Sequence, residues 1–492
     1  GDYDIDGICS IYILFKGLLF LGADVDYEVP DRIKDGYGIN ENLIKQAYDD
    51  GREVILTCDN GIAATEQVRY ARSLGFTVIV TDHHDIRYEE IDGKKTYILP
   101  EADAIVNPKQ SDCSYPCSFL CGAGVAYKLM QELFKRTGNE GKEREFLVFA
   151  GIATVGDVVD LKDENRIFVK EGLKQFKETD NYGLRALTVI NGLDDKEICA
   201  YHIGFIIGPC LNASGRLDTA KRALKMLLSK DKYEAERLAG DLVSLNEERK
   251  SLTAAAVILA EKIVDENYTD DTVLVIYLPD CHESIAGIVA GRIREKYYKP
   301  VIVLTKGEDG VKGSARSIES YNIFEKLCEC SHLLTKFGGH PLAAGMSLKE
   351  ENIEELRKYL NEHSNLTKDD LTEKVWIDVP MPLEYINEDI INELSLLEPY
   401  GKGNEKPVFA DKNLIIVSFM RIGRDGKFAK MELKKNNGMS IFAMCFNNCD
   451  GLNEAFINNK RISCTYYPEI NEFRGNKKLQ ICITGYRIEE DI

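Results

Sequence analysis

Two β-rich runs of this chain each end in side chains that can bind a metal ion. Residues 53–58 lead into Asp59-Asn60-Gly61, and residues 76–81 lead into Asp82-His83-His84. A helical pattern up to Leu74 separates the two runs, and strands that alternate with helices indicate parallel βαβ units. The ligand crevice of an open parallel sheet lies outside the carboxyl ends of its strands. The sequence therefore predicts an α/β fold in which Asp59 and His83 meet.

The first seven residues carry the densest group of carboxylates. Asp2, Asp4 and Asp6 stand at every second position and Gly7 follows them, a spacing that lines one face of an extended segment. Like charges so close together persist only where a cation lies among them. A solvated acidic terminus is the alternative for this stretch taken by itself. A helical pattern from Ile8 to Gly22 follows, and residues 25–29 are predicted to form a strand.

Asp157 supplies a further acidic position. It follows a helical run over residues 144–153, so it either binds a metal or caps a helix. Hard oxygen donors with a single nitrogen suit Mn²⁺ or Mg²⁺ better than zinc, and their number suggests two ions that share a bridging carboxylate. Two such ions about 3.5–4 Å apart promote hydrolysis of a phosphodiester or phosphoanhydride. The candidate ligands are Asp2, Asp4, Asp6, Asp59, His83 and Asp157.

The middle of the chain contains a charged helical stretch and a second α/β region. Residues 217–267 form two long helices or one helix that breaks near residues 229–231. The second α/β region begins at Thr272 and carries the glycine-containing segments 313–317 and 338–340, which include Ser314, Arg316 and His340. Small residues around a histidine bring backbone N–H groups and an imidazole close to a phosphate, or they simply form tight turns.

From residue 376 the composition turns toward β structure. Five short runs at 414–420, 429–433, 440–446, 461–467 and 479–486 fit a small barrel of the OB type. Aromatic and basic residues of this region are candidates for stacking on bases and contacting the backbone of single-stranded nucleic acid: Phe428, Lys430, Tyr467, Phe473 and Arg474. The alternative is that the aromatic residues among them fill the barrel core. The predicted architecture is two α/β lobes joined by long helices and followed by an OB-type β-barrel. Its parts are residues 1–216, 217–267, 268–375 and 376–492.

Bulk properties limit the class of protein. A chain of 492 residues is expected to form two to four domains. No membrane span or signal peptide is visible, and the 14 cysteines are typical of reduced cytosolic thiols. Cys113, Cys117 and Cys121 lack a fourth zinc ligand nearby. The net charge of -19 argues against indiscriminate binding to phosphate backbones, although local basic sites and bound cations can still attract them.

These segments resemble the DHH phosphoesterase superfamily. The series is residues 2–7, Asp59-Asn60-Gly61, Asp82-His83-His84 and Val155-Gly156-Asp157, and Gly338-Gly339-His340 resembles the signature of its DHH-associated second domain. Residues 212–216, 287–290, 313–317 and 399–404 narrow the resemblance to the RecJ family of bacterial single-strand-specific 5′→3′ exonucleases. The family has a strand before Gly1, so we expect native sequence to precede this chain.

The resemblance implies roles for matching residues. The six candidate ligands would hold two Mn²⁺ or Mg²⁺ ions, with Asp59 as the bridge and His84 near the scissile phosphate. Asp82 would orient the imidazoles. The 5′ end or its phosphate would contact Arg32, Arg216, Ser314 and Arg316, and His340 would contact a phosphate of the substrate. Cys210 stands where the family generally has an arginine that contacts a phosphate.

The resemblance implies a metal-dependent exonuclease that releases 5′-mononucleotides from single-stranded DNA in repair and recombination. We expect a cytoplasmic monomer that binds no membrane and cooperates with a helicase and a single-strand-binding protein. Two alternatives are a DHH phosphodiesterase or pyrophosphatase for small substrates, and a catalytically silent strand-binding scaffold. The long C-terminal β region argues against the first, and the complete ligand set argues against the second.

Overall fold

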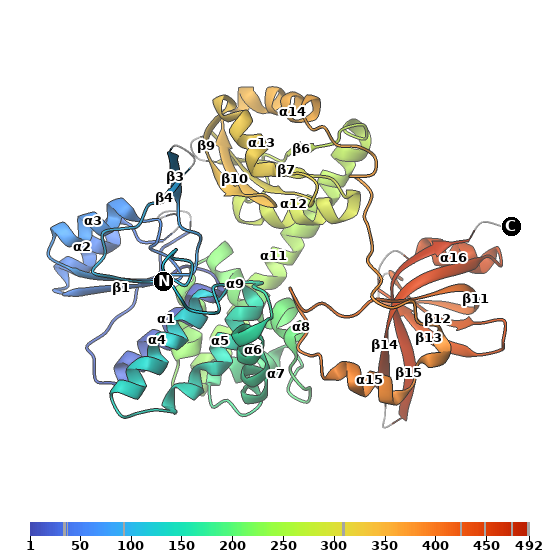
Figure 1. The fold of residues 1–492 in the computed structure, drawn as a ribbon, viewed down its shortest axis with the longest axis horizontal. Coiled ribbons are helices and arrows are strands. Elements are labelled where there is room, and N and C mark those ends of the chain that lie inside the picture. The colour runs from blue at the N-terminus through green and yellow to red at the C-terminus, as the bar shows by residue number, and fades with distance from the viewer. Residues whose placement is uncertain are drawn as a thin grey trace. The chain divides into compact units, whose positions relative to one another are not determined.

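In the computed structural model, the chain folds into two compact units. The structure describes residues 1–32, 36, 38–91, 94–307, 310–423, 426–446, 449–473 and 476–489. One unit contains residues 1–159 and 163–373, and the other contains residues 160–162 and 374–492 (Figure 1). Within the described ranges, no helix has the length and apolar character needed to span a bilayer.

A parallel sheet with strand order β1-β2-β5 forms the first lobe. Its strands are β1 (Val54–Cys58), β2 (Thr77–Thr81) and β5 (Ala104–Val106). The helices α2 (Glu41–Asp49) and α3 (Thr65–Ser73) pack on it through Ile44, Val68 and Ala71. The strands predicted at residues 53–58 and 76–81 are confirmed, and they are neighbours with Cys58 opposite Thr81. Their carboxyl ends therefore open at the same edge of the sheet.

A hairpin interrupts the path from β2 to β5. The strands β3 (Tyr88–Ile91) and β4 (Lys94–Tyr97) pair antiparallel, with Tyr88 opposite Tyr97 (Figure 1). The sequence reasoning did not anticipate this element. It starts only a few residues after His84, so it stands beside the predicted metal centre.

Buried helices form the rest of this lobe. The long apolar run of α1 (Ile5–Phe20) packs against α4 (Gly122–Arg136) and α5 (Leu147–Gly156) in one hydrophobic core. The further helices are α6 (Asp163–Phe176), α7 (Tyr182–Ile190), α8 (Ala200–His202) and α9 (Gly208–Leu217).

Two expectations for the N-terminal segment are wrong. The three aspartates do not share an extended strand, because α1 already begins at Ile5 and Asp4 is its N-cap. The Asp4 carboxylate accepts hydrogen bonds from the N–H groups of Asp6 and Gly7, which favours a helical first turn. Residues 25–29 are not a strand in the described structure, and the Gly1 ammonium donates to the Glu28 carbonyl 3.2 Å away.

The charged stretch at residues 217–267 forms two helices, and the break between them lies at residues 229–231, as predicted. α10 (Lys221–Leu228) ends and α11 (Lys232–Asn267) begins after it, with Asp231 as its N-cap. The Asp231 carboxylate accepts a hydrogen bond from the Glu234 N–H at 2.7 Å. The 36 residues of α11 lead into the second lobe.

The second lobe is a five-stranded sheet with order β6-β7-β8-β10-β9. Its strands are β6 (Leu274–Tyr277), β7 (Val301–Gly307), β8 (Gly310–Arg316), β9 (Leu334–His340) and β10 (Ala343–Leu348). α12 (Glu283–Tyr297) covers one face, and α13 (Ile323–Glu329) and α14 (Ile353–Glu362) cover the other (Figure 1). Alternate residues of β6 enter different cores, Leu274 on the α12 face and Val275 on the α14 face. Burial on both faces explains the continuous apolar run.

The second unit is a closed barrel with strand order β11-β12-β13-β15-β14. The strands are β11 (Phe409–Ile422), β12 (Phe428–Lys434), β13 (Ser440–Cys445), β14 (Arg461–Phe473) and β15 (Asn476–Ile488). The helix α15 (Glu388–Ser395) precedes β11, and α16 (Asp450–Ile457) lies between β13 and β14 in the sequence. The predicted five-stranded barrel is confirmed. Tyr467 belongs to its core, whereas Phe428 is exposed. The side chains of Phe473 and Arg474 lie outside the described part of the chain.

Candidate metal centre and substrate site

Asp6 is held by the start of a helix far away in sequence. Its Oδ2 accepts a hydrogen bond from the Gly122 N–H at 2.6 Å, and its Oδ1 accepts one from the Ala123 N–H at 2.8 Å. These are free N–H groups of the first turn of α4, where the helix dipole also favours a negative charge. The side chain is fully buried. Asp6 is therefore fixed in position.

Gly122 also determines how closely α4 approaches Asp59. A Cβ atom at Gly122 would lie 2.7 Å from the Asp59 Cβ and 3.0 Å from its Oδ1. Glycine is required there because the backbone of one element packs directly on a functional side chain. Sequence reasoning missed Gly122 and Ala123, and the only signal was the run of small residues that opens α4.

Asp59 occupies the turn that ends β1. Its backbone has φ of 57°, in the left-handed region that aspartate tolerates better than most residues. The Thr57 hydroxyl donates to the Asn60 carbonyl at 2.8 Å and fixes this turn. The turn aims the buried Asp59 carboxylate at the end of β2, where its Oδ1 lies 3.1 Å from the His83 Nε2.

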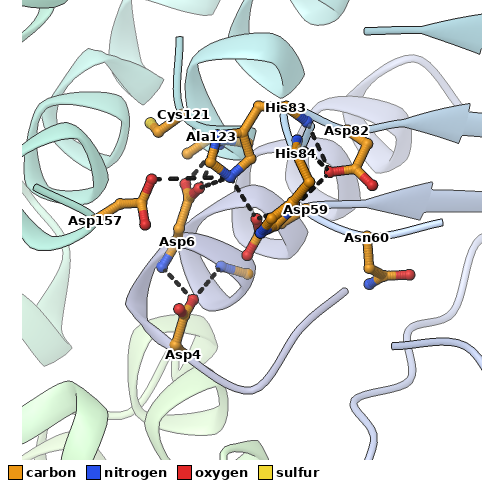
Figure 2. A network of polar contacts seen from close by, with 12 residues as sticks. Asp4, Asp6, Asp59, Asn60, Asp82, His83, His84, Cys121, Ala123 and Asp157 are labelled. Atoms are coloured by element: carbon orange, nitrogen blue, oxygen red, sulfur yellow. Dashed lines mark hydrogen bonds and ion pairs between the residues drawn. The ribbon is translucent and has the colours of Figure 1, made fainter. Parts of the chain in front are cut away.

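The His83 imidazole lies at the centre of the group (Figure 2). Its Nε2 is 3.5 Å from Asp6 Oδ2 and 3.8 Å from Asp157 Oδ2, in addition to the contact with Asp59. Burial lowers the pKa of His83, although the charge of Asp6 opposes the change. The ring is thus disposed to be neutral, which is the form that binds a metal ion.

Asp82 orients His84. Its Oδ1 lies 2.7 Å from the His84 Nδ1 and accepts hydrogen bonds from the N–H groups of both histidines, while its Oδ2 accepts from the Ile62 N–H. Burial disfavours the proton on His84, but the hydrogen bond and charge of Asp82 outweigh it and raise the pKa of His84. This shift favours the protonated form of His84, next to the candidate metal ligands. Among the described contacts, Asp82 hydrogen-bonds to the imidazole of His84, whereas at His83 it contacts the backbone N–H.

Asp2, Asp4 and Asp157 complete the group. Asp157 directly follows α5 and does not cap the start of a helix. Asp2 is buried, and among the atoms the structure describes its Oδ1 has no hydrogen-bond partner. A buried carboxylate oxygen without a partner is strongly unfavourable unless a cation is bound.

Electrostatics shows how crowded the carboxylates are. Burial and the charge of Asp4 raise the pKa of Asp2 to about 7, and burial with the charges of Asp6 and Asp4 raises the pKa of Asp157 to about 8. Burial and the charges of Asp6, Asp4 and Asp2 raise the pKa of Asp59 well above its ordinary value. Burial of carboxylates that also repel one another is typical of a site built to hold positive charge.

The six predicted ligands come together, although they come from separate parts of one lobe. Their ligand atoms, with those of His84, lie within 4.8 Å of one another in three overlapping groups: Asp2, Asp4 and Asp59; Asp6, His83 and Asp157; and Asp59, His83 and His84. Asp59 and His83 each belong to two groups, and of the two only the Asp59 carboxylate has the two oxygens that a bridging ligand uses. The oxygen-rich donors and the unpartnered Asp2 oxygen fit divalent cations such as Mn²⁺ or Mg²⁺.

Three of the predicted substrate residues gather around the start of α12. Arg216 donates from Nη1 to the Ser284 carbonyl at 2.8 Å. A Cβ atom at Gly287 would lie 3.0 Å from the Arg316 Nη2 and 3.4 Å from the Ser314 Oγ, so this glycine makes room for both. Burial lowers the pKa of Arg216 to about 10, which still leaves it charged at neutral pH. The cluster presents two guanidinium groups, which suit a terminal phosphate.

His340 and Arg32 extend this arrangement. In the second sheet Ala343 pairs with Arg316 on one side and with His340 on the other, so both lie at the same register. The Arg32 guanidinium lies 5.0 Å from the centre of the Tyr3 ring, beside the acidic segment. Cys210 is buried and accepts a hydrogen bond from Asn246 of α11 at 3.4 Å. That position is part of the packing between helices, and it presents no cation to a phosphate.

Comparisons with known proteins identify three domain families along the chain. Residues 1–154 match the DHH family N-terminal domain, residues 270–364 the DHHA1 domain, and residues 377–485 the RecJ OB domain. The single-stranded-DNA-specific exonuclease RecJ of Bacillus subtilis is 37% identical over the whole chain, which spans 61% of that protein. RecJ of Haemophilus influenzae is 33% identical over 98% of the chain, which covers 86% of that relative.

Solved structures agree in fold. The crystal structure of RecJ in complex with Mn²⁺ from Thermus thermophilus covers all of this chain with a TM-score of 0.83 at 28% identity, and the chain covers 69% of it. The Mg²⁺ complex of the same protein has a TM-score of 0.77 at 27% identity. Both ions are those that the donor set fits.

Proposed function

Because the chain belongs to the RecJ family of single-stranded-DNA-specific exonucleases, we propose that it is a metal-dependent exonuclease that degrades single-stranded DNA from the 5′ end and releases 5′-mononucleotides. The observation that carries this proposal is the convergence of five carboxylates and one neutral imidazole beside a cluster of arginines. The phosphodiester bond is the chemical target that needs both features. Two bound divalent cations would activate a water and stabilise the leaving oxygen of an in-line displacement.

The chain's own residues divide the work. Asp2, Asp4, Asp6, Asp59, His83 and Asp157 hold the cations, and α4 fixes Asp6 among them. Asp82 orients His84 and its hydrogen bond and charge raise the pKa of that imidazole, which favours a ring that donates a hydrogen bond to a non-bridging oxygen of the scissile phosphate. Arg32, Arg216, Ser314 and Arg316 bind the 5′ end, and His340 binds a phosphate of the strand. The substrate is thereby positioned before the bond is cut.

The barrel adds a surface for the strand. The partly exposed Phe442 ring has the ammonium groups of Lys430 and Lys478 at 5.4 Å and 5.9 Å from its centre. A base can stack on an aromatic ring while neighbouring lysines contact phosphates. This arrangement supports a role for the barrel in holding single-stranded DNA. It also disfavours a small-substrate phosphodiesterase, which has no need of such a surface.

We extend the proposal to the cellular setting. None of the fourteen cysteines, all of which the structure describes, is in a disulfide, which supports a reducing compartment such as the cytoplasm. We propose a monomer with four parts, at residues 1–216, 217–267, 268–375 and 376–492, that acts in DNA repair and recombination. A helicase that exposes single strands and a protein that coats them are the expected partners, because the substrate has to be unwound first.

The direct test uses purified protein, Mn²⁺ and oligonucleotides. Single-stranded and blunt duplex DNA labelled at the 5′ end are incubated separately, and the products are resolved by length. We expect rapid release of labelled mononucleotide from the single strand and little from the duplex. Asp59→Ala should remove the activity. Equal attack on duplex DNA, or internal cuts without mononucleotide product, would refute the proposal.

A further inference from the structure

A cavity lined by three tyrosines opens beside the metal centre. Its volume is about 530 Å³, within the ~300–1,000 Å³ of small-molecule sites. Its walls include Tyr88 and Tyr97 of the β3–β4 hairpin, Tyr115, Lys109, Gln110 and Asp85. Nothing in the mechanism above uses this cavity. Its aromatic walls with a few polar groups are the composition that binds a flat, partly polar ring.

The cavity lies at the same sheet edge as the metal centre. Asp85 directly follows His84 at the end of β2, and Lys109 lies three residues after the end of β5. Lys109 Nζ pairs with Asp85 Oδ1 at 2.9 Å, and the Asn107 Nδ2 donates to the His84 carbonyl at 3.0 Å. The loops that hold the cavity are therefore tied to the loop that holds the metal ligands.

The tyrosines of the hairpin are available for stacking. Tyr88 and Tyr97 are 47% and 42% exposed, and their ring centres lie 6.0 Å apart in an edge-to-face arrangement. Lys95 lies 4.2 Å from the centre of the Tyr88 ring and adds a cation. Tyr115, by contrast, is held by a hydrogen bond from its hydroxyl to Glu164. One fixed ring and two accessible rings thus line a space at the sheet edge that carries His84.

The position of the cavity specifies which nucleotide reaches it. Arg32 lies over Tyr3, and Gly215, the neighbour of Arg216, packs on the Tyr3 carbonyl, so these two arginines are on the Tyr3–Asp4 side of Asp59. His340 lies on the other side, close enough to Asp85 of the cavity wall to act on its charge. The cavity is on the His84 side. Asp59 shares one group with Asp4 and another with His84, which places it between the two sides. In Figure 2 Asp4 and the Asp82–His84 pair likewise lie at opposite ends of the cluster.

We propose that this cavity binds the base of the second nucleotide of the strand, the nucleotide that carries the scissile phosphate. The inference rests on the proposed exonuclease function. A strand whose 5′ phosphate is at the arginines and whose next phosphate is at Asp59 continues toward His84 and the tyrosines. Stacking there aligns the scissile bond, and the base is recognised through its flat face, which every base has.

The kinetic test replaces single bases with an abasic residue in a 5′-phosphorylated single strand. With the unmodified protein, an abasic residue at the second position should lower kcat/KM for the first cleavage about tenfold, the loss of one aromatic stack, while one at the fifth position should not. Tyr97→Leu should lose about tenfold on the intact strand and lose nothing further on the strand abasic at position two. Tyr97→Phe keeps the ring and should behave as the unmodified protein.

Controls separate stacking from stability and from the proposed function. Tyr182→Leu removes a tyrosine of similar exposure, 41%, that does not line the cavity, and should leave every substrate unchanged. In a second measurement without cleavage, 2-aminopurine at position two is bound in EDTA. Its fluorescence should be quenched by the unmodified protein and much less by Tyr97→Leu. This result decides the cavity even if no strand is cut. Equal effects at positions two and five, or additive losses in the kinetic cycle, would overturn the inference.

Discussion

Replacing Gly122 with alanine should damage the metal centre without touching any metal-binding side chain. The new Cβ atom would lie 2.7 Å from the Asp59 Cβ, about 0.7 Å short of the 3.4 Å at which ordinary contact begins. Asp59 cannot move away freely, because it is buried in a left-handed turn at the end of β1. Overpacking of this kind destabilises by about 1–3 kcal/mol.

Gly124→Ala provides the matched control. It lies two residues further along α4, and its Cβ would meet Leu120 at 3.4 Å and Phe168 at 3.5 Å, which is ordinary contact. Both variants gain helix propensity of up to about 1 kcal/mol. That gain largely cancels when the two are compared, so Gly122→Ala should be less stable than Gly124→Ala by about 1–3 kcal/mol.

The assay measures thermal unfolding, Mn²⁺ affinity and cleavage of a single-stranded oligonucleotide for both variants. A displacement of about 1 Å in a catalytic group can lower the rate about 100-fold, so we expect Gly122→Ala to lose at least tenfold in turnover and to bind Mn²⁺ more weakly. Gly124→Ala should match the unmodified protein. If the two variants differ by less than twofold in both turnover and Mn²⁺ affinity, Gly122 does not position Asp59 and the reasoning is refuted.

Three further perturbations test the site. Asp59→Ala should reduce cleavage to the level of the metal-free protein. The fold should stay intact by circular dichroism, because burial and the charges of Asp6, Asp4 and Asp2 disfavour the carboxylate that is removed. Near-full turnover would contradict the bridging role. The pKa values of about 7 for Asp2 and about 8 for Asp157 exceed the ordinary 3.8, so the folded state retains protons that the unfolded state releases. The unfolding temperature in EDTA should therefore fall as the pH rises from 4 to 8, and each group should lose about 1.4 kcal/mol of stability per unit of pKa shift. Adding Mn²⁺ should restore the unfolding temperature at pH 8. An unfolding temperature that rises with pH in EDTA would contradict the raised pKa values of Asp2 and Asp157. Arg316→Ala should slow cleavage of 5′-phosphorylated strands about tenfold or more and 5′-hydroxyl strands much less, measured as kcat/KM on both; equal losses would argue against recognition of the terminal phosphate.

Much of the metal site was predictable because strand order places sequence-distant residues at one edge. The runs before Asp59 and His83 are short and apolar, and neighbouring parallel strands bring their ends together. The spacing of Asp2, Asp4 and Asp6 was informative about chemistry and misleading about conformation. Aspartates at alternate positions suit an extended segment, but an aspartate is also a strong helix N-cap, and the capping bonds of Asp4 prevailed.

Other parts of the site left little trace in the sequence. Gly122 and Ala123 contribute backbone N–H groups to a carboxylate more than one hundred residues away, and no side-chain pattern encodes such a contact. The hairpin of β3 and β4 is built largely from charged residues, including Glu89, Glu90 and Lys95, that resemble a loop. Its two tyrosines acquire meaning only because they face each other across the strands, beside the loop of His84.

The acidic centre trades stability for a place to hold cations. The backbone compensates Asp6 through two N–H groups of α4 and Asp4 through two of α1. No comparable bond among the described atoms reaches the buried Asp2 Oδ1. A buried charge left without compensation is destabilising by several kcal/mol, and a bound cation removes that penalty only from the folded protein. Metal binding and folding of this centre are therefore coupled, and the rigidity of α1 and α4 beneath it keeps the carboxylates together while they still repel one another.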